Sequence, residues 1–295
     1  MRKKKMTAFD IFNLCIFILL ALACAFPFYY IFINTISGND LVAKGAITFL
    51  PKDIHFNNYL EVFKIKGLFP AFFVSVARTL IGTGFTVISA AFLGYAMSKQ
   101  EYWNRKFWYR FIVITMYLNA GIIPAYINMK NLGLLNSFWV YVLPALASPF
   151  NVILTKTYIE SIPDSLEESA ALDGAGYLKR FFYVVFPLAK PIVATVAIFA
   201  AVQQWNSFMD TVMYMTKGNF YTLQYILYKH LNEVNTLAQM MQQNSTAITS
   251  SAQLTLTPAS IRFTITAVTV LPILLVYPFF QRYIVKGVMI GAVKG

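Results

Sequence analysis

The stretch Phe69–Met97 reads FPAFFVSVARTLIGTGFTVISAAFLGYAM and carries a single charged residue, Arg78. A helix needs about 20 mostly apolar residues to cross the hydrocarbon layer of a bilayer, and this stretch is long enough. Comparable runs lie at Phe9–Ile36, Phe107–Met129, Ser137–Ile159, Val184–Met209 and Ile261–Phe280. The sequence therefore predicts an all-α membrane protein with six transmembrane helices.

The composition also indicates that the bilayer is the solvent of this chain. Hydrophobic residues make up 58% of the 295 residues and charged residues only 12%, with a mean hydropathy of +0.59. A soluble domain carries about a quarter charged residues. The net charge of +12 does not indicate nucleic-acid binding, because membrane proteins concentrate Lys and Arg in short cytoplasmic loops. We expect one transmembrane domain over residues 1–295, in contact with lipid and not with nucleic acid.

The distribution of Lys and Arg predicts the orientation of the chain. The basic cluster at 2–5 belongs in the cytoplasm, and so does the turn that holds Lys99 and Arg105. Both termini and the loop 160–183 are then cytoplasmic, and residues 210–260 form an external loop. Lys44, Lys52, Lys64 and Lys66 fall outside, which weakens the bias without reversing it.

Part of the predicted external loop has an unusual composition. Asn235–Gln253 is almost free of charge and rich in Gln, Asn, Ser and Thr. Two interpretations stay open for this stretch: a solvated loop, or a contact surface for an external partner.

The predicted cytoplasmic loop has the local signals of a short helix. Pro163 suits the first turn, where its missing N–H is not needed. Ser165-Leu166-Glu167-Glu168 matches a capping box, in which Ser165 and Glu168 satisfy free N–H groups. Asp173-Gly174 favours a break, because Gly adopts left-handed backbone angles at little cost. We expect a helix that ends at Gly174, followed by a second piece that leads to Pro187.

This loop resembles the EAA loop of bacterial ABC importer permeases. The resemblance rests on Glu168–Ala175 (ESAALDGA), with nine residues between Gly174 and Val184-Val185-Phe186-Pro187. Ser169 stands in place of an alanine, Val184 of Ile and Phe186 of Leu. The sequences Phe26–Tyr30, Trp205-Asn206 and Lys286–Val288 are similar to carbohydrate-uptake permeases of the maltose-transporter type. Within these, the chain looks closest to the second permease of systems for complex oligosaccharides, including those that contain uronic acids.

The resemblance implies a fold, partners and roles for this chain. It implies the type I ABC importer permease fold in a bacterial cytoplasmic (inner) membrane. The partners would be a homologous second permease, an ABC ATPase dimer, an extracytoplasmic solute-binding protein and an oligosaccharide substrate. Residues 160–183, here called the coupling loop, would dock on the ATPase. The residues implied in this coupling are Glu168, Ser169, Ala170, Asp173, Gly174, Ala175 and Pro187.

The chain has no nucleotide-binding or catalytic motif of its own. The pattern Gly-x-x-x-x-Gly-Lys-Ser/Thr, which cradles phosphates, does not occur in the sequence. ATP and Mg²⁺ therefore belong to the partner ATPase, and we expect no cofactor in this chain. His55 and His230 stand apart from each other and from both cysteines, so no metal site is predicted.

Amide and indole side chains within the spans are candidates for a substrate pathway. Polar groups are costly in a membrane and often mark such a pathway. The candidates are Asn119, Gln203, Gln204, Trp205 and Asn206. Hydrogen bonding between packed helices is the alternative role for them. Arg78 is expected to snorkel to the interface, although it could attract an acidic substrate, and Ala90-x-x-x-Gly94 indicates a close helix crossing.

Other classes of function make different predictions. Half of a dimeric secondary transporter for small polar solutes would carry charged residues deep in its spans, and few are found. An intramembrane enzyme would need a nucleophile with a base, or a metal site, within the spans. A membrane scaffold would leave the patterned loop unexplained. The sequence thus favours the permease of an ATP-driven oligosaccharide importer.

Overall fold

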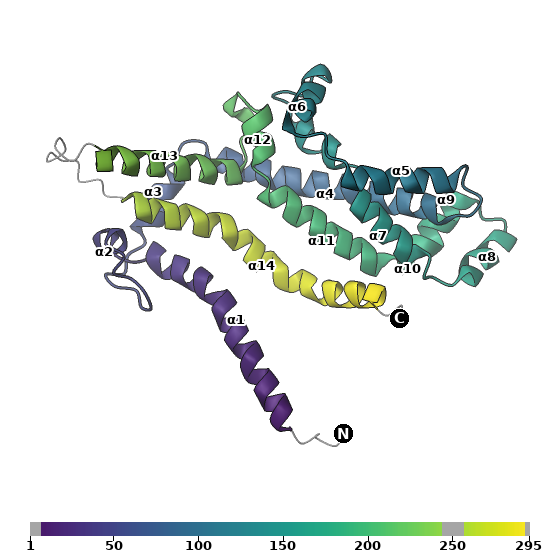
Figure 1. Ribbon diagram of the computed structural model, residues 1–295, viewed down its shortest axis with the longest axis horizontal. Coiled ribbons are helices and arrows are strands. Elements are labelled where there is room, and N and C mark those ends of the chain that lie inside the picture. The colour runs from purple at the N-terminus through teal and green to yellow at the C-terminus, as the bar shows by residue number, and fades with distance from the viewer. Residues whose placement is uncertain (1–6, 244–256, 293–295) are drawn as a thin grey trace. The chain divides into compact units, whose positions relative to one another are not determined.

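The computed structural model describes residues 7–243 and 257–292, and every regular element among them is helical (Figure 1). The chain forms two compact units, Met1–Leu68 with Leu227–Pro272 and Phe69–Ile226 with Ile273–Gly295. The boundaries between the units fall after the first residue of α4 (Leu68–Ser98) and inside α13 (Leu223–Gln243) and α14 (Pro258–Ala292).

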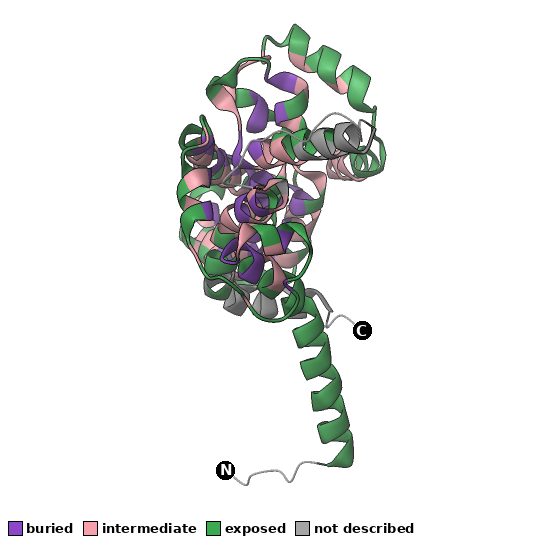
Figure 2. Cartoon of the chain, turned by 90° about the vertical axis from the view of Figure 1, so that its left-hand side faces the viewer, coloured by how far each residue is buried: buried purple, intermediate pink, exposed green. Residues whose placement is uncertain are grey.

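The first unit holds α1 (Ala8–Thr35), α2 (Asn39–Ala43) and α3 (Asn57–Phe63). Its apolar core joins Ile33, Val42 and Ile47 to Phe263 of α14. The α1 helix begins with a capping box between Thr7 and Asp10. Most of its apolar side chains are exposed in the isolated chain (Figure 2), as expected for a surface that lipid or another subunit covers.

The second unit contains the remaining helices. They are α4 (Leu68–Ser98), α5 (Arg105–Tyr117), α6 (Ile122–Asn131), η1 (Phe138–Tyr141), η2 (Leu143–Ala145), α7 (Pro149–Ile159), α8 (Asp164–Leu172), α9 (Tyr177–Arg180), the π-helical turn η3 (Phe181–Val185), α10 (Phe186–Leu188), α11 (Lys190–Asn206), α12 (Met209–Tyr214) and η4 (Gly218–Phe220). All-helical architecture is therefore confirmed for the part of the chain that the structure describes.

Three of the six predicted spans are continuous helices, namely α1, α4 and residues 259–276 of α14. The other three are bent pairs: α5 and α6 by 117°, η1–η2 and α7 by 44°, and α9–α10 and α11 by 80°. The predicted span Phe107–Met129 is not one continuous helix, because the chain turns at Gly121, whose φ is +87°. Six spans are reached only if each bent pair crosses the membrane as one.

Neighbouring side chains satisfy the backbone groups that the break before Pro149 leaves free. The hydroxyl of Thr86 donates to the carbonyl of Ala145 at 3.1 Å, and Ser89 donates to the carbonyl of Leu146. Irregular backbone within a membrane protein needs such internal partners. The α4 helix thus stabilises the broken span beside it.

Two glycines let α4 approach its neighbours closely. A Cβ on Gly94 would lie 3.0 Å from the backbone nitrogen of Lys156 and from Thr155 on α7. A Cβ on Gly82 would lie 2.6 Å from Nε2 of Gln204 on α11. The expected structural role of the Ala90–Gly94 stripe agrees with this packing.

The predicted external loop contains more regular structure than expected. The α13 helix runs to Gln243, so the polar stretch Asn235–Gln253 begins within a helix. Residues 244–256 lie outside the described residues, and the two interpretations of this stretch remain open there.

Candidate functional site

The coupling loop begins with a helix whose start differs from the prediction. Pro163 occupies the N-cap of α8 with φ −58° and ψ 126°, and no side chain caps this end. The expected capping box is wrong because the helix begins at Asp164, which places Ser165 inside the first turn. The backbone carbonyl of Ser165 instead accepts a bond from the hydroxyl of Ser169 at 2.8 Å.

The other end of α8 agrees with the prediction. Gly174 has a φ of +78°, its N–H bonds the carbonyl of Ala171, and the N–H of Ala175 bonds the carbonyl of Ala170. This pair of bonds is a Schellman motif, which terminates a helix and reverses the chain. Gly174 is therefore the residue that turns the loop back toward the bundle.

A half-buried carboxylate attaches α8 to the end of α4. Oε1 of Glu167 accepts a hydrogen bond from the Tyr95 hydroxyl at 2.7 Å, and Oε2 pairs with the ammonium of Lys99. Arg180 of α9 lies 3.6 Å from the same carboxylate. The Glu167 side chain is only 12% exposed, so these cations face it with little screening by water.

A second ion pair holds the start of the loop. Glu160, the C-cap of α7, pairs with Arg105 at the start of α5 and with Lys156 one turn earlier at 2.7 Å. Arg105 also donates to the carbonyl of Met97 near the end of α4 at 2.8 Å. Both ends of the loop are thus tied to the end of α4 or to helices next to it.

An apolar cluster holds the end of the coupling loop, where the chain leads back into the helix bundle. Phe181 is 4% exposed and contacts Phe92, Tyr95 and Phe186 with its ring. It begins the π-helical turn η3, a geometry that often marks functional segments. Burial of this ring makes α8 and α9 a rigid projection of the bundle.

The face of α8 away from the bundle is exposed. Leu172 is 90% exposed and Leu166 is 47% exposed, and Glu168 lies on the surface. Of the other predicted coupling residues, Ser169, Asp173, Gly174 and Pro187 are exposed, and Ala170 and Ala175 are half-buried. Exposed apolar side chains on a short ordered helix are suited to docking in a groove of another protein.

A polar cavity of about 530 Å³ lies beside this helix. Glu167, Arg180 and Lys99 line it from one side, and Glu160, Arg105 and Glu168 also contribute. The ion pairs described above form part of its wall, so a change in the position of α8 would alter them directly.

The predicted substrate-pathway residues occupy two places. Gln203, Gln204, Trp205 and Asn206 end α11, whereas Asn119 lies at the bend between α5 and α6 and accepts a bond from the N–H of Gly121 at 2.9 Å. Gln203 and Asn206 are exposed, and Gln204 and Trp205 are buried. The Asn206 amide oxygen accepts a bond from Gln224 at 3.3 Å.

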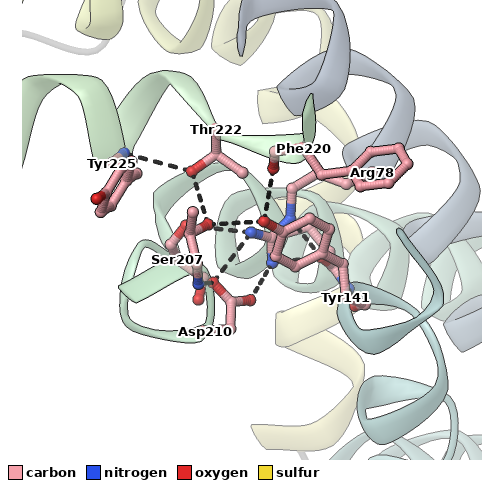
Figure 3. A network of polar contacts seen from close by, with 9 residues as sticks. Arg78, Tyr141, Ser207, Asp210, Phe220, Thr222 and Tyr225 are labelled. Atoms are coloured by element: carbon pink, nitrogen blue, oxygen red, sulfur yellow. Dashed lines mark hydrogen bonds and ion pairs between the residues drawn. The ribbon is translucent and has the colours of Figure 1, made fainter. Parts of the chain in front are cut away.

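Arg78 lies in a buried network and does not snorkel, so that expectation is wrong. It is 2% exposed and pairs with Asp210 at 2.5 Å, and its guanidinium also donates to the side chain of Gln204 and the carbonyl of Ser207 (Figure 3). The Tyr141 ring stacks over it with 4.2 Å between the guanidinium carbon and the ring centroid. The carboxylate of Asp210 compensates the charge of the Arg78 guanidinium, so this side chain can stay buried and need not extend to the membrane–water interface.

Sequence reasoning missed Glu167, Lys99 and the partner of Arg78. The pair Glu167–Lys99 had one signal in the sequence. Lys99 ends an apolar run on the predicted cytoplasmic side, where the acidic coupling loop is also expected. Nothing in the spacing of Arg78 and Asp210 relates them, because they meet only where α4 packs against the end of α11 and the start of α12.

The geometry agrees with what comparison with known proteins finds. The family described as the inner membrane component of binding-protein-dependent transport systems matches residues 82–290. The chain belongs to this family. It is therefore a membrane-embedded transport component and not a catalytic enzyme, and the resemblance noted in the sequence is confirmed.

Individual members of the family match over nearly the whole chain. The polygalacturonan/rhamnogalacturonan transport system permease protein YtcP of Bacillus subtilis is 30% identical over 97% of this chain and 98% of its own length. The arabinooligosaccharides transport system permease protein AraQ of Halalkalibacterium halodurans is 24% identical over 95% and 94%.

A solved structure gives the same fold. It is the crystal structure of a bacterial ABC transporter involved in the import of the acidic polysaccharide alginate, which matches with a TM-score of 0.82 and 30% identity over 95% of this chain and 99% of the matched chain. The ABC importer permease fold is therefore confirmed.

Proposed function

We propose that this chain is a permease subunit of an ATP-driven importer and that its ATPase docks on the coupling loop. The observation that carries the proposal is that α8 exposes one surface while its half-buried Glu167 side chain ties the helix to the end of α4. A partner that moves α8 would move the bundle with it, because the loop is held by ion pairs and by Phe181.

The proposed assembly follows from membership of the family. Its parts are this chain, a homologous second permease, an ATPase dimer that binds ATP and Mg²⁺, and an extracytoplasmic binding protein. The chain would lie in the cytoplasmic membrane of a bacterium with six spans and both termini inside. The family supports this arrangement over the alternative of a dimeric secondary transporter.

Substitution of Glu168 tests the docking role. Glu168→Ala removes an exposed carboxylate from α8, and we expect weaker association with the ATPase and lower uptake with normal membrane insertion. The measurement is co-purification of the ATPase together with transport in membrane vesicles. Glu101→Gln, which changes an exposed carboxylate on a neighbouring turn, is the control. Wild-type association and uptake for Glu168→Ala would contradict the docking role of this residue.

We propose an oligosaccharide cargo, with acidic chains as the first candidates. The relative named for polygalacturonan and rhamnogalacturonan transport and the alginate importer structure both support this class. Of the predicted pathway residues, Gln203 and Asn206 are exposed at the end of α11 and carry amides that can bond sugar hydroxyls, whereas Gln204 and Trp205 are buried. The test is stimulation of ATP hydrolysis by the assembled importer across neutral and uronic-acid oligosaccharides. Stimulation by neutral oligosaccharides alone would contradict the acidic assignment.

A further inference from the structure

The α4 helix differs from the other candidate spans in the described part of the second unit. It has 31 residues and no break, whereas the three bent pairs change direction by 117°, 44° and 80°. A bent pair can absorb a displacement by changing its angle at the break. A continuous helix moves as one body, so a displacement at one end of α4 reaches the other.

One end of α4 is attached to the coupling loop. Tyr95 and Lys99 bind the carboxylate of Glu167, and Phe92 and Tyr95 pack on the ring of Phe181. Gly94 brings the same end into close contact with the backbone of α7. These contacts combine charge, hydrogen bonding and close packing, so the loop and this end of α4 form a single rigid body.

A second cluster attaches α4 to the chain beyond α11. Arg78 lies 17 positions before Tyr95, which corresponds to about 25 Å along a helix. Its guanidinium binds the carboxylate of Asp210 at 2.5 Å and 3.2 Å and the carbonyl of Ser207 at 3.2 Å. The side chain of Gln204 accepts two further bonds from it at 3.0 Å and 3.1 Å. All of these bonds thus reach one short segment, residues 204–210.

The network continues through hydroxyl groups to Thr222, the residue before α13. The Tyr141 ring covers Arg78, and its hydroxyl bonds Thr211 at 3.0 Å and the carbonyl of Phe220 at 2.7 Å. Thr211 in turn bonds Thr222 at 3.1 Å (Figure 3). The segment 207–222 is therefore tied to α4 through these polar contacts.

Arg78 is buried and its partner Asp210 is 20% exposed. Such an ion pair is a poor way to gain stability alone, because removal of charge from water is costly. The ion pair forms only when its two side chains have the right distance and orientation. It therefore suits a positioning role, in which it holds α4 and the segment that contains Asp210 in one arrangement. We infer that α4 is the rigid link between the coupling loop and the segment 207–222, with Arg78 and Asp210 as positioning residues at its far end. The inference rests on the proposed function, since it requires that the ATPase acts on the coupling loop.

The test uses the complete importer in lipid nanodiscs with its substrate-loaded binding protein. Asp210→Asn removes the charge from the carboxylate side, and Arg78→Lys keeps the charge but loses the planar fork that bonds several partners. ATP hydrolysis is measured with and without the loaded binding protein. Glu61→Gln, in an exposed ion pair with Lys64 in the first unit, is the matched control.

We expect both variants to assemble with wild-type basal hydrolysis, while the stimulated-to-basal ratio falls at least about fivefold, the lower end of typical coupling between sites. A role confined to stability would lower assembly and both rates together. A smaller fall in the ratio overturns the inference, and so does failure of both variants to assemble. If the wild-type importer itself shows no stimulation, the proposed function fails instead.

A double substitution tests whether the two ends of α4 act along one route. Glu167→Gln weakens the attachment at the coupling loop, and Asp210→Asn weakens the opposite attachment. If both act through α4, the combined variant loses no more stimulation than the worse single variant.

Hydrogen exchange of residues 160–183 gives a second measurement. Asp210→Asn should abolish its response to the loaded binding protein, and a wild-type response would contradict the link.

Discussion

At the scale of single residues, two adjacent carboxylates of the coupling loop have different surroundings. Glu167 is half-buried against Tyr95, Lys99 and Arg180, whereas Glu168 is exposed. Successive residues on a helix are about 100° apart, so neighbours in sequence face different surroundings. Position on the helix, and not residue type, therefore decides which carboxylate holds the loop and which is available to a partner.

The left-handed backbone of Gly174 leads to a prediction with an internal control. An alanine there has no steric contact within 4 Å, so its cost is the backbone strain of about 1–2 kcal/mol at a φ of +78°. Gly176 has a φ of −67° and equally open surroundings. The free loop can relieve this strain by opening the turn, and docking must then restore it, so we expect Gly174→Ala to weaken ATPase binding by up to roughly five- to thirtyfold and Gly176→Ala to leave it unchanged. Equal affinities of the two variants would mean that this turn does not shape the docking surface.

At the scale of elements, the packing of α4 depends on where its glycines lie. A Cβ on Gly94 would meet the backbone of α7 at 3.0 Å, but a Cβ on Gly84 would have no neighbour within 4 Å. Gly94→Ala should destabilise the folded chain by about 1–3 kcal/mol through overpacking, and Gly84→Ala should be neutral or slightly stabilising. Thermal unfolding of the purified importer measures both. A Gly94→Ala variant as stable as Gly84→Ala would show that α4 and α7 do not need this close contact.

The elements also show how far the sequence could lead. Apolar length predicted α1 and α4 closely, because a continuous membrane helix needs little more than length and hydrophobicity. The bend at Gly121 was missed because its cause is the backbone angle of one residue within an apolar run. The end of α8 was predicted from Gly174, but its start was not, since Pro163 took the cap position that Ser165 was expected to fill.

At the scale of the whole molecule, exposed apolar surface and family membership lead to the same conclusion. Much of the described apolar surface, α1 above all, is uncovered in the isolated chain, and a transport component of this family works within lipid and beside other subunits. The partners themselves could be predicted only through the resemblance. The sequence of this chain shows that apolar surface is exposed, but it does not show which proteins cover that surface.

Site-specific cross-linking can show whether α8 contacts the ATPase in the assembled importer. A photoreactive side chain replaces Leu172, which is 90% exposed on α8, and Lys64, whose side chain is 69% exposed in the predicted external segment, serves as the comparison. Each variant is irradiated in the assembled importer, and the cross-linked subunit is identified by mass spectrometry. The account predicts that position 172 cross-links to the ATPase and that position 64 does not. An ATPase cross-link from position 64 with none from position 172 would contradict it.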